Sequence, residues 1–262
     1  MTSSVRGCRA AIVCAAFAAL NPGLATAQSA ALPAGFVYLR DIDPTIAQDI
    51  RYAGFDNFVG RPLPGYEAPE CILRQDAAAA LRRVQADIAA SGLSLKVYDC
   101  YRPVRAVHAM VAWANDGRPE ATTKRFFPKL HKSTLFGMGY IASHSQHSSG
   151  NTVDLTLIAR TGAPAAAFDA RAAYGPCTAP ASVSSPDNSI DMGTGFDCFD
   201  PASHTWSTLI GVEQRRQRNI LVEAMRRQGF RNYFREWWHF SYSAPGRSYD
   251  FSIRSRIATL AQ

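Results

Sequence analysis

Apolar residues recur at helical spacing in three stretches of the chain. The first stretch can begin with Asp76 as its cap and end at Gly92, and its apolar face consists of Ala77, Leu81, Val84 and Ile88. The second can begin at Pro103, which suits the first turn of a helix, and continue toward Gly117. The third covers residues 213–228. This spacing predicts three amphipathic helices, each with one face against a core.

Two other stretches alternate between apolar and polar residues, as half-buried strands do. They are residues 93–97 and 152–157, and Asp154 falls on the polar face of the second. Residues 160–200 are rich in Ala, Pro, Gly and Ser and show no convincing period, so we expect a long excursion from the core. The irregular order of helices and strands predicts one α+β domain over residues 28–262, with a small, mostly antiparallel central sheet flanked by helices.

The first 27 residues have the pattern of a signal peptide. Arg6 and Arg9 give a positive start, residues 10–20 are an eleven-residue apolar stretch, and 25–27 offer small residues to a signal peptidase. The apolar stretch is too short to span a bilayer, and no later segment reaches the roughly 18 apolar residues of a spanning helix. We therefore expect a signal peptide at 1–27, no transmembrane segment, and a periplasmic or secreted protein.

The composition is that of a globular protein, with 47% hydrophobic residues, 14 Phe, 10 Tyr and 4 Trp. The formal net charge is +7, and loss of the two leader arginines lowers it to about +5. This excess favours approach to anionic surfaces such as cell-wall polymer. It is not gathered into the long basic runs that nucleic-acid binding requires, so we expect no nucleic-acid partner.

Export changes how the cysteines are interpreted, because exported cysteines enter an oxidising space. Four of them follow the leader, and we favour the pairs Cys71 with Cys100 and Cys177 with Cys198 among the three possible pairings. A structural zinc on these residues is disfavoured because no Cys-x-x-Cys pair occurs. Cys14, within the leader, leaves a lipid-anchor site as a minor alternative.

Two common kinds of hydrolytic site are absent from the sequence. Neither Gly-x-Ser-x-Gly nor Ser-x-x-Lys occurs, which excludes the usual serine hydrolases and the penicillin-binding serine site. His-Glu-x-x-His is also missing, so the commonest helical zinc-protease site is excluded.

Two of the six histidines, His147 and His239, lie in motifs whose other residues suit a hydrolytic metal site. His147 and Asp154 are seven residues apart, and Gly150 between them lets the chain turn, so a loop-to-strand corner can present both to one ion. His239 would come from a distant strand. Two imidazoles and one carboxylate leave zinc an open position for water, so we expect one Zn²⁺ per chain in a cleft of the sheet. His144, as a His-x-x-His pair with His147, is the alternative ligand.

Glu236 is the natural fourth member of this site, but its spacing raises a geometric problem. Residues three apart on a regular strand point to opposite faces, so Glu236 and His239 could not both face one metal. The segment must bend near Trp237, or Glu236 must precede the strand. In either case the carboxylate can take a proton from the attacking water and deliver it to the departing amine.

These motifs and three others occur in one order along the chain. They are Asp49-Ile50-Arg51-Tyr52-Ala53, Tyr98-Asp99-Cys100-Tyr101-Arg102-Pro103, Ser145 through Asp154, Asp191 through Asp197, and Glu236-Trp237-Trp238-His239-Phe240. In this the chain resembles the VanX-type D-alanyl-D-alanine dipeptidases, zinc enzymes related to the D,D-carboxypeptidases of peptidoglycan metabolism. The resemblance implies zinc on His147, Asp154 and His239, with Glu236 as general acid and base.

The resemblance also implies roles for residues outside the metal ligands. Arg102 would stabilise the transition state, because a fixed guanidinium supplies donors where the carbonyl oxygen gains charge. Ser145, Tyr52 and Asp197 are candidates for holding the two ends of a small dipeptide. Cys100 is a departure, since the family usually has Gly before Tyr-Arg-Pro.

Taken together, we expect an exported zinc dipeptidase that cleaves D-alanyl-D-alanine and contacts peptidoglycan. One alternative is a D,D- or L,D-carboxypeptidase acting on longer peptidoglycan peptides with the same metal set. The double Trp after Glu236 favours the dipeptidase, because those carboxypeptidases more often show Glu-Pro-Trp-His. The other alternative is a cell-wall binding module that keeps the metal only as a structural fastener.

Overall fold

The structure is a computed structural model that describes residues 1–2, 31–120, 123–180, 182–242 and 246–256. The signal peptide expected at 1–27 lies outside this range except for its first two residues, so it stays a prediction. None of the helices in the described part of the chain has the length and hydropathy of a membrane span.

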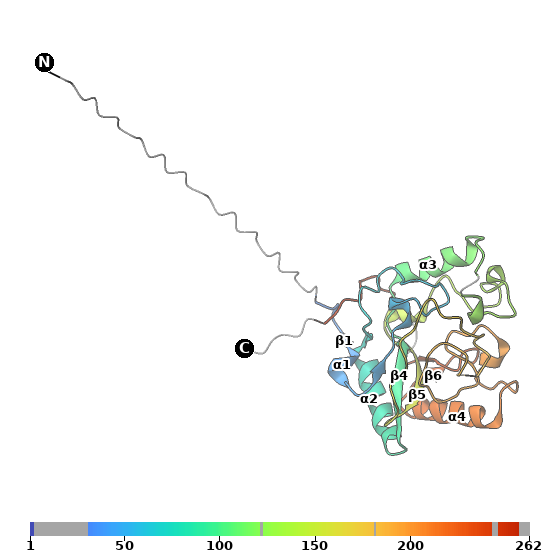
Figure 1. Ribbon diagram of the computed structural model, residues 1–262. Helices are drawn as coiled ribbons and strands as arrows, with labels where there is room; N and C mark the ends of the chain where they lie inside the picture. The colour runs from blue at the N-terminus through green and yellow to red at the C-terminus, as the bar shows by residue number, and fades with distance from the viewer. Residues whose placement is uncertain (3–30, 121–122, 181, 243–245, 257–262) are drawn as a thin grey trace. The chain divides into compact units, whose positions relative to one another are not determined.

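A five-stranded sheet forms the centre of the domain, in the order β2-β4-β5-β7-β6 (Figure 1). Only β2 and β4 are parallel, and the remaining neighbours are antiparallel. The strands are β2 (Ala47–Gln48), β4 (Leu93–Asp99), β5 (Thr152–Ala159), β6 (Arg231–Asn232) and β7 (His239–Ser241). A separate antiparallel pair joins β1 (Phe36–Tyr38) to β3 (Ile72–Arg74). The predicted α+β fold with a mostly antiparallel central sheet is confirmed.

The three predicted helices are present and flank this sheet. The α-helices among the described residues are α1 (Leu39–Ile42), α2 (Gln75–Ala89), α3 (Val104–Asn115) and α4 (Val212–Arg227). Residues of α2 contact both β4 and α4, and the apolar face of α2 is buried as its spacing predicts. Short 3-10 helices complete the described elements: η1 (Arg51–Ala53), η2 (Lys124–Phe126), η3 (Lys132–Thr134), η4 (Gln146–Ser149) and η5 (Pro201–Ser203).

Two predicted helix starts were wrong, by two residues for α2 and by one residue for α3. Asp76 lies in the first turn of α2 instead of at its cap, which is Arg74, and its Oδ1 accepts a 3.0 Å hydrogen bond from the Ala77 N–H. The carboxylate there still favours the helix by its charge at the positive end. Pro103 is the N-cap of α3, in an extended conformation, and the helix begins at Val104.

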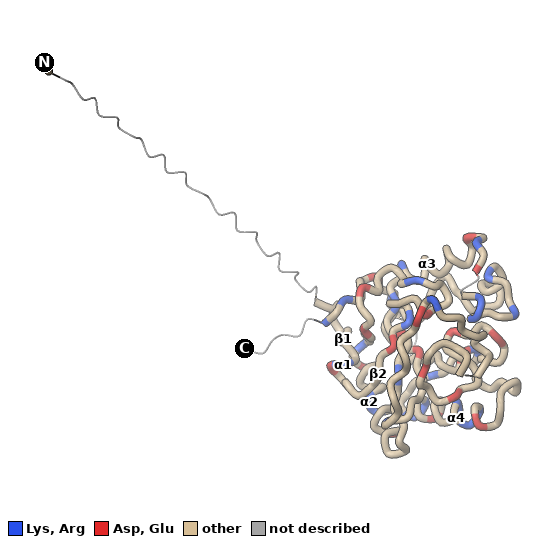
Figure 2. The backbone as a smooth tube through the Cα atoms, viewed as in Figure 1, with Lys and Arg blue, Asp and Glu red and all other residues tan. Residues whose placement is uncertain are grey.

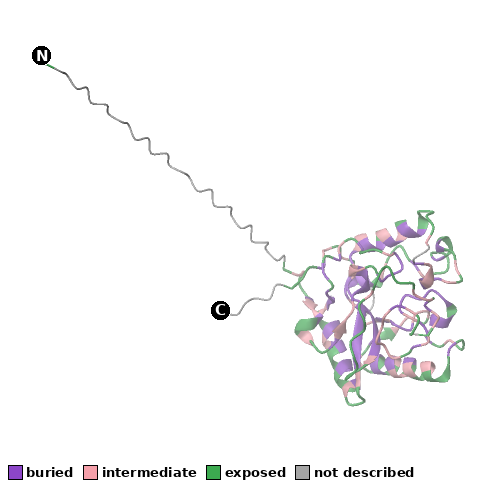
Figure 3. Ribbon diagram, viewed as in Figure 1, coloured by how far each residue is buried: buried purple, intermediate pink, exposed green. Residues whose placement is uncertain are grey.

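The expectation that residues 152–157 form a half-buried strand was also wrong. All residues from Thr152 to Leu157 are buried, and Asp154 is only 2% exposed. The side chain of Asp154 is buried because His147, His239 and Arg102 lie against it, at 3.3, 3.1 and 3.6 Å from its carboxylate oxygens. Figure 3 shows the resulting buried centre along the sheet.

Residues 160–180 and 182–200 contain no named helix or strand, as expected of the excursion. Both favoured disulfides are present, with Cα–Cα separations of 5.3 Å for Cys71–Cys100 and 5.4 Å for Cys177–Cys198. The second closes the excursion on itself.

A buried charge network ties the excursion to the sheet. Asp187 accepts from Arg51 at 3.0 Å and from Lys96 at 2.5 Å, and both of these cations are almost fully buried. Arg51 also pairs with Asp56. Over the described chain as a whole, acidic and basic residues are interspersed (Figure 2).

Candidate active site

Three elements bring the expected metal ligands together. His147 lies on η4, Asp154 on β5 and His239 on β7, where Asp154 and His239 are direct partners in the antiparallel ladder. Gly150 has a φ of +79° and connects η4 to β5. A Cβ at this position would overlap the Phe36 ring, so glycine is required both for the turn and for the packing.

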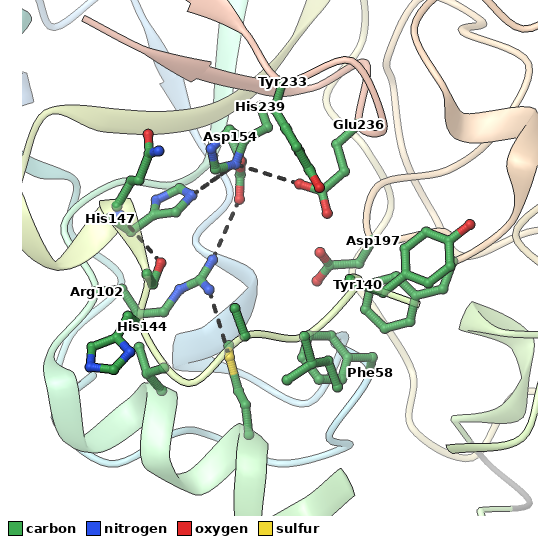
Figure 4. A pocket seen from close by; sticks show the side chains of 18 of the residues that line it. Phe58, Arg102, Tyr140, His144, His147, Asp154, Asp197, Tyr233, Glu236 and His239 are labelled. Carbon is green, nitrogen blue, oxygen red and sulfur yellow. Dashed lines mark hydrogen bonds and ion pairs between the residues drawn. The ribbon is translucent and has the colours of Figure 1, made fainter. Parts of the chain in front are cut away.

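The facing atoms of the three side chains form a nearly equilateral triangle (Figure 4). Nε2 of His147 lies 3.3 Å from Nδ1 of His239 and 3.3 Å from Oδ1 of Asp154. Nδ1 of His239 lies 3.1 Å from the same Oδ1. A tetrahedral zinc ion with bonds of about 2.0–2.1 Å holds its ligand atoms about 3.3–3.4 Å apart, so the spacing fits one such ion.

The donor chemistry leads to the same interpretation. Nδ1 of His147 lies 2.8 Å from the Cys100 carbonyl and donates to it, so Nε2 of a neutral ring carries a lone pair. That lone pair faces a carboxylate oxygen that has no regular hydrogen-bond partner within the described structure. The lone pairs of His147 Nε2 and Asp154 Oδ1 repel each other unless a cation lies between them. His144 also lines the cavity, but it is exposed and outside this grouping, so the grouping does not include the alternative ligand.

Glu236 precedes β7, which resolves the spacing problem. It lies in the tight connection from β6, where its N–H donates to Tyr233 O at 2.9 Å and its carbonyl accepts from His239 N at 3.2 Å. Its Oε2 reaches to 3.5 Å from His239 Nδ1. Burial raises the pKa of Glu236 to about 7, with Asp154 reinforcing the shift and His239 opposing it. A carboxyl with this pKa can both accept and release a proton near neutrality.

Arg102 lies beside the ligand carboxylate, just after β4. Its Nε donates to Asp99 Oδ2 at 2.8 Å, and its Nη2 lies 3.6 Å from Asp154 Oδ2. The guanidinium stacks over the Tyr52 ring at 4.9 Å. Among the described residues, its Nη1 contacts only the Met110 sulfur, a weak acceptor, at 3.7 Å. One edge of the guanidinium is therefore available to a ligand.

Asp99 is a site residue that the sequence interpretation missed. It is fully buried, accepts from the Tyr66 hydroxyl at 2.6 Å, and places its Oδ2 3.4 Å from His147 Nδ1 as well as beside Arg102. Burial raises its pKa, and Arg102 and His147 oppose that shift. The only signal in the sequence was its place three residues before Arg102 at a strand end.

The three residues expected to hold a substrate line one cavity with the metal ligands. The Tyr52 hydroxyl donates to Asp197 Oδ2 at 2.8 Å, and Asp197 has a φ of +55°, which is unusual for a residue other than glycine. Burial, with Asp154 nearby, raises the pKa of Asp197 well above its usual value. Ser145 caps η4 by accepting from His147 N at 3.2 Å.

The cavity itself is small, about 190 Å³, compared with the 300 Å³ or more of drug-sized ligand sites. Part of its wall is apolar: Phe58, Val107, Met110, Ile141 and Phe199. Two tyrosines that the sequence interpretation did not single out, Tyr140 and Tyr233, also line it. Such a space accommodates a small, partly apolar ligand.

The family model described as Peptidase_M15, D-ala-D-ala dipeptidase, matches residues 33–173 and 177–256. The chain belongs to this family. It is therefore a peptidase of a metal-dependent family, and the His147, Asp154 and His239 grouping could hold the metal. The resemblance drawn from the five sequence motifs is confirmed.

Several relatives match over most of the chain, and each is named D-alanyl-D-alanine dipeptidase. The Enterococcus faecalis protein is 33% identical over 79% of this chain and 90% of its own length. The Streptomyces coelicolor protein is 32% identical over 83% of this chain and 98% of its own, and the Enterococcus faecium protein is 30% identical over 84% and 98%. The M15 domain thus occupies nearly all of the described structure.

Proposed function

We propose that the chain is an exported, zinc-dependent dipeptidase that hydrolyses D-alanyl-D-alanine to two molecules of D-alanine. Its family and the names of its relatives support the reaction. The observation that carries the proposal is the triangle of ligand atoms with sides of 3.1–3.3 Å, with Glu236 Oε2 3.5 Å from one corner.

His147, Asp154 and His239 would hold the zinc ion. When bound, the ion polarises the scissile carbonyl and makes the attacking water more acidic. The buried surroundings of Asp154 and His147 exclude competing solvent from these side chains.

In the proposed reaction, Glu236 transfers the proton and Arg102 stabilises the negative charge that develops. The Glu236 carboxylate accepts a proton from the attacking water and delivers it to the departing amine, and its pKa of about 7 suits both steps. Arg102 directs its free Nη1 edge to the carbonyl oxygen as that oxygen gains negative charge. Asp99 fixes the opposite edge of the guanidinium.

The ends of the dipeptide find complementary groups in the same cavity. Asp197, held by Tyr52, offers a carboxyl to the substrate ammonium group, whose positive charge favours the ionised form. Ser145 offers its hydroxyl to the substrate carboxylate. The small cavity favours a free dipeptide over a longer peptide.

The deciding experiment compares three substrates on purified protein whose bound metal has been quantified. We expect cleavage of D-alanyl-D-alanine, no cleavage of L-alanyl-L-alanine, and slow or absent cleavage of a pentapeptide ending in D-alanyl-D-alanine. A preference for the pentapeptide would instead identify a carboxypeptidase. No cleavage of the D,D-dipeptide by metal-loaded protein would overturn the proposal.

The expected leader and the two disulfides support a periplasmic or secreted location, because such bonds persist in oxidising compartments. There the enzyme would act beside peptidoglycan in salvage or turnover of cell-wall dipeptide. Fractionation of cells that produce the full chain tests this location, and recovery of uncleaved protein in the cytoplasm would contradict it.

A further inference from the structure

Backbone hydrogen bonds join Tyr233 to both Glu236 and His239. Its N–H donates to His239 O at 3.0 Å, and its carbonyl accepts from Glu236 N at 2.9 Å. Asn232 closes the same connection, since its Nδ2 donates to the carbonyls of Glu236 and His239, each at 3.0 Å. The position of Tyr233 is thus fixed relative to the proposed base and to a proposed ligand.

The side chain of Tyr233 extends from this connection into the cavity. Its ring packs edge-on against the His239 imidazole, with centroids 5.8 Å apart and planes at 69°. The hydroxyl end is directed toward the Glu236 side of the cavity, across Asp154 from Arg102 (Figure 4). The half-buried phenol therefore forms part of the wall around the reacting groups.

The Tyr233 hydroxyl makes no hydrogen bond to any residue that the structure describes, whereas the hydroxyl of Tyr52 is already bonded to Asp197. A phenol is protonated at neutral pH, because its ordinary pKa is near 10, and it can donate a hydrogen bond without losing its proton. A rigidly held donor without a protein partner, facing the cavity, is suited to a group of the substrate.

Charge develops on two oxygens during the proposed hydrolysis, and the two need separate donors. Arg102 can serve the oxygen of the scissile carbonyl through its free edge. The other oxygen comes from the attacking water and lies beside Glu236, which removes its proton. Tyr233, on the same side as Glu236, is placed to serve that second oxygen.

We propose that Tyr233 is a catalytic residue whose hydroxyl donates a hydrogen bond to the water-derived oxygen of the tetrahedral intermediate. The hydroxyl keeps its proton throughout, and Glu236 alone transfers the proton to the amine. This inference rests on the proposed dipeptidase function and adds a second hydrogen-bond donor opposite Arg102.

The test is Tyr233→Phe, which removes the hydroxyl and keeps the ring that packs on His239. We expect kcat on D-alanyl-D-alanine to fall about 10-fold to 100-fold, a smaller range than for a sole oxyanion donor because Arg102 remains. KM and zinc content should stay within twofold of wild type. The matched control is Tyr242→Phe, whose ring packs on Phe230 at 5.2 Å outside the cavity, and it should leave all of these quantities unchanged.

Calorimetry adds a readout that does not depend on turnover. The probes are D-alanine and a phosphinate analogue of the dipeptide, in which a tetrahedral PO₂ group replaces the scissile amide. Tyr233→Phe should weaken binding of the phosphinate by about the same factor as kcat and leave D-alanine binding unchanged.

Three outcomes would overturn the inference. The inference would fail, and the proposed function would stand, if Tyr233→Phe kept wild-type kcat and phosphinate affinity. The same holds if a loss of zinc from the variant explained its whole defect. Failure of the wild-type enzyme to cleave the dipeptide would overturn this inference together with the proposed function.

Discussion

The carboxylate of Asp99 accepts a 2.8 Å hydrogen bond from Nε of Arg102, and its other oxygen accepts from Tyr66. The same carboxylate lies 3.4 Å from Nδ1 of His147, whose N–H donates to the Cys100 carbonyl, so one buried acid holds the guanidinium and lies beside a proposed ligand. Here the Cys100 carbonyl fixes the tautomer of His147, and Asp99 fixes the direction of the Arg102 guanidinium.

Replacement of Asp99 by Asn should therefore impair catalysis more than metal binding. We expect Asp99→Asn to lower kcat/KM about 10-fold to 100-fold, the range typical of second-sphere changes, because Arg102 loses the charge that orients it. Steady-state kinetics with metal analysis checks this. Asp76→Asn, on the exposed start of α2, is the control and should retain full activity. Wild-type kcat/KM in Asp99→Asn would show that Arg102 needs no such support.

Glu236 makes the reaction pH-dependent in a defined direction. The carboxyl must be deprotonated to accept the water proton, and burial raises its pKa to about 7, so activity should fall as the pH drops below about 7. A bound cation stabilises the carboxylate and moves this limb to lower pH. Glu236→Gln should bind zinc normally and lose activity by at least about 100-fold. A pH profile of kcat/KM and metal analysis of the variant measure both effects, and an active Glu236→Gln enzyme would favour a purely structural metal.

Metal removal should destabilise the domain as well as inactivate it. Without a cation, the facing atoms of His147, Asp154 and His239 lie 3.1–3.3 Å apart with no group between them. We expect a chelator to lower the melting temperature and added zinc to restore it. His147→Ala should no longer bind the ion, whereas His144→Ala should bind it as wild type does. Loss of metal from His144→Ala would revise the ligand set.

The lowered pKa of Asp187, which lies outside the proposed metal site, predicts a separate dependence of stability on pH. Burial alone would raise its pKa, but Arg51 and Lys96 lower it overall from 3.8 to about 2. A lowered carboxyl pKa contributes stability that is fully present above pH 3.8 and is lost as the pH falls through 2. Asp187→Asn should lose about 2 kcal/mol of unfolding free energy at pH 7, and the difference should shrink toward pH 2. Urea unfolding measures this, and a difference independent of pH would exclude the charge mechanism.

The elements that the sequence predicted best are those whose signal is local. The apolar spacing of α2, α3 and α4 located these helices to within a few residues, because each helix places its own apolar residues on one face. The closeness of His147 and Asp154 was predictable for the same reason, since Gly150 and a strand following it fix their relation over seven residues.

What could not be predicted depends on contacts between distant segments. The alternation in residues 152–157 shows which side chains are polar. It does not show whether they are buried, because most of the residues that bury Asp154 come from segments far along the chain. The local signal of Asp99 was weak because an acid at a strand end is common, and its position between Arg102 and His147 gives it a role in the site. Tyr233 was inseparable in the sequence from the aromatic residues that pack in the core around it.

Only six residues, 233–238, separate β6 from β7, and this short connection carries Tyr233 and Glu236 and leads directly into His239. An insertion or deletion there would shift all three side chains at once, so the segment has little freedom to change length. The excursion before Cys177 supplies none of the residues that line the cavity. Length variation among homologues, and any grafted loop intended to admit bulkier substrates, is therefore better tolerated there than between the last two strands.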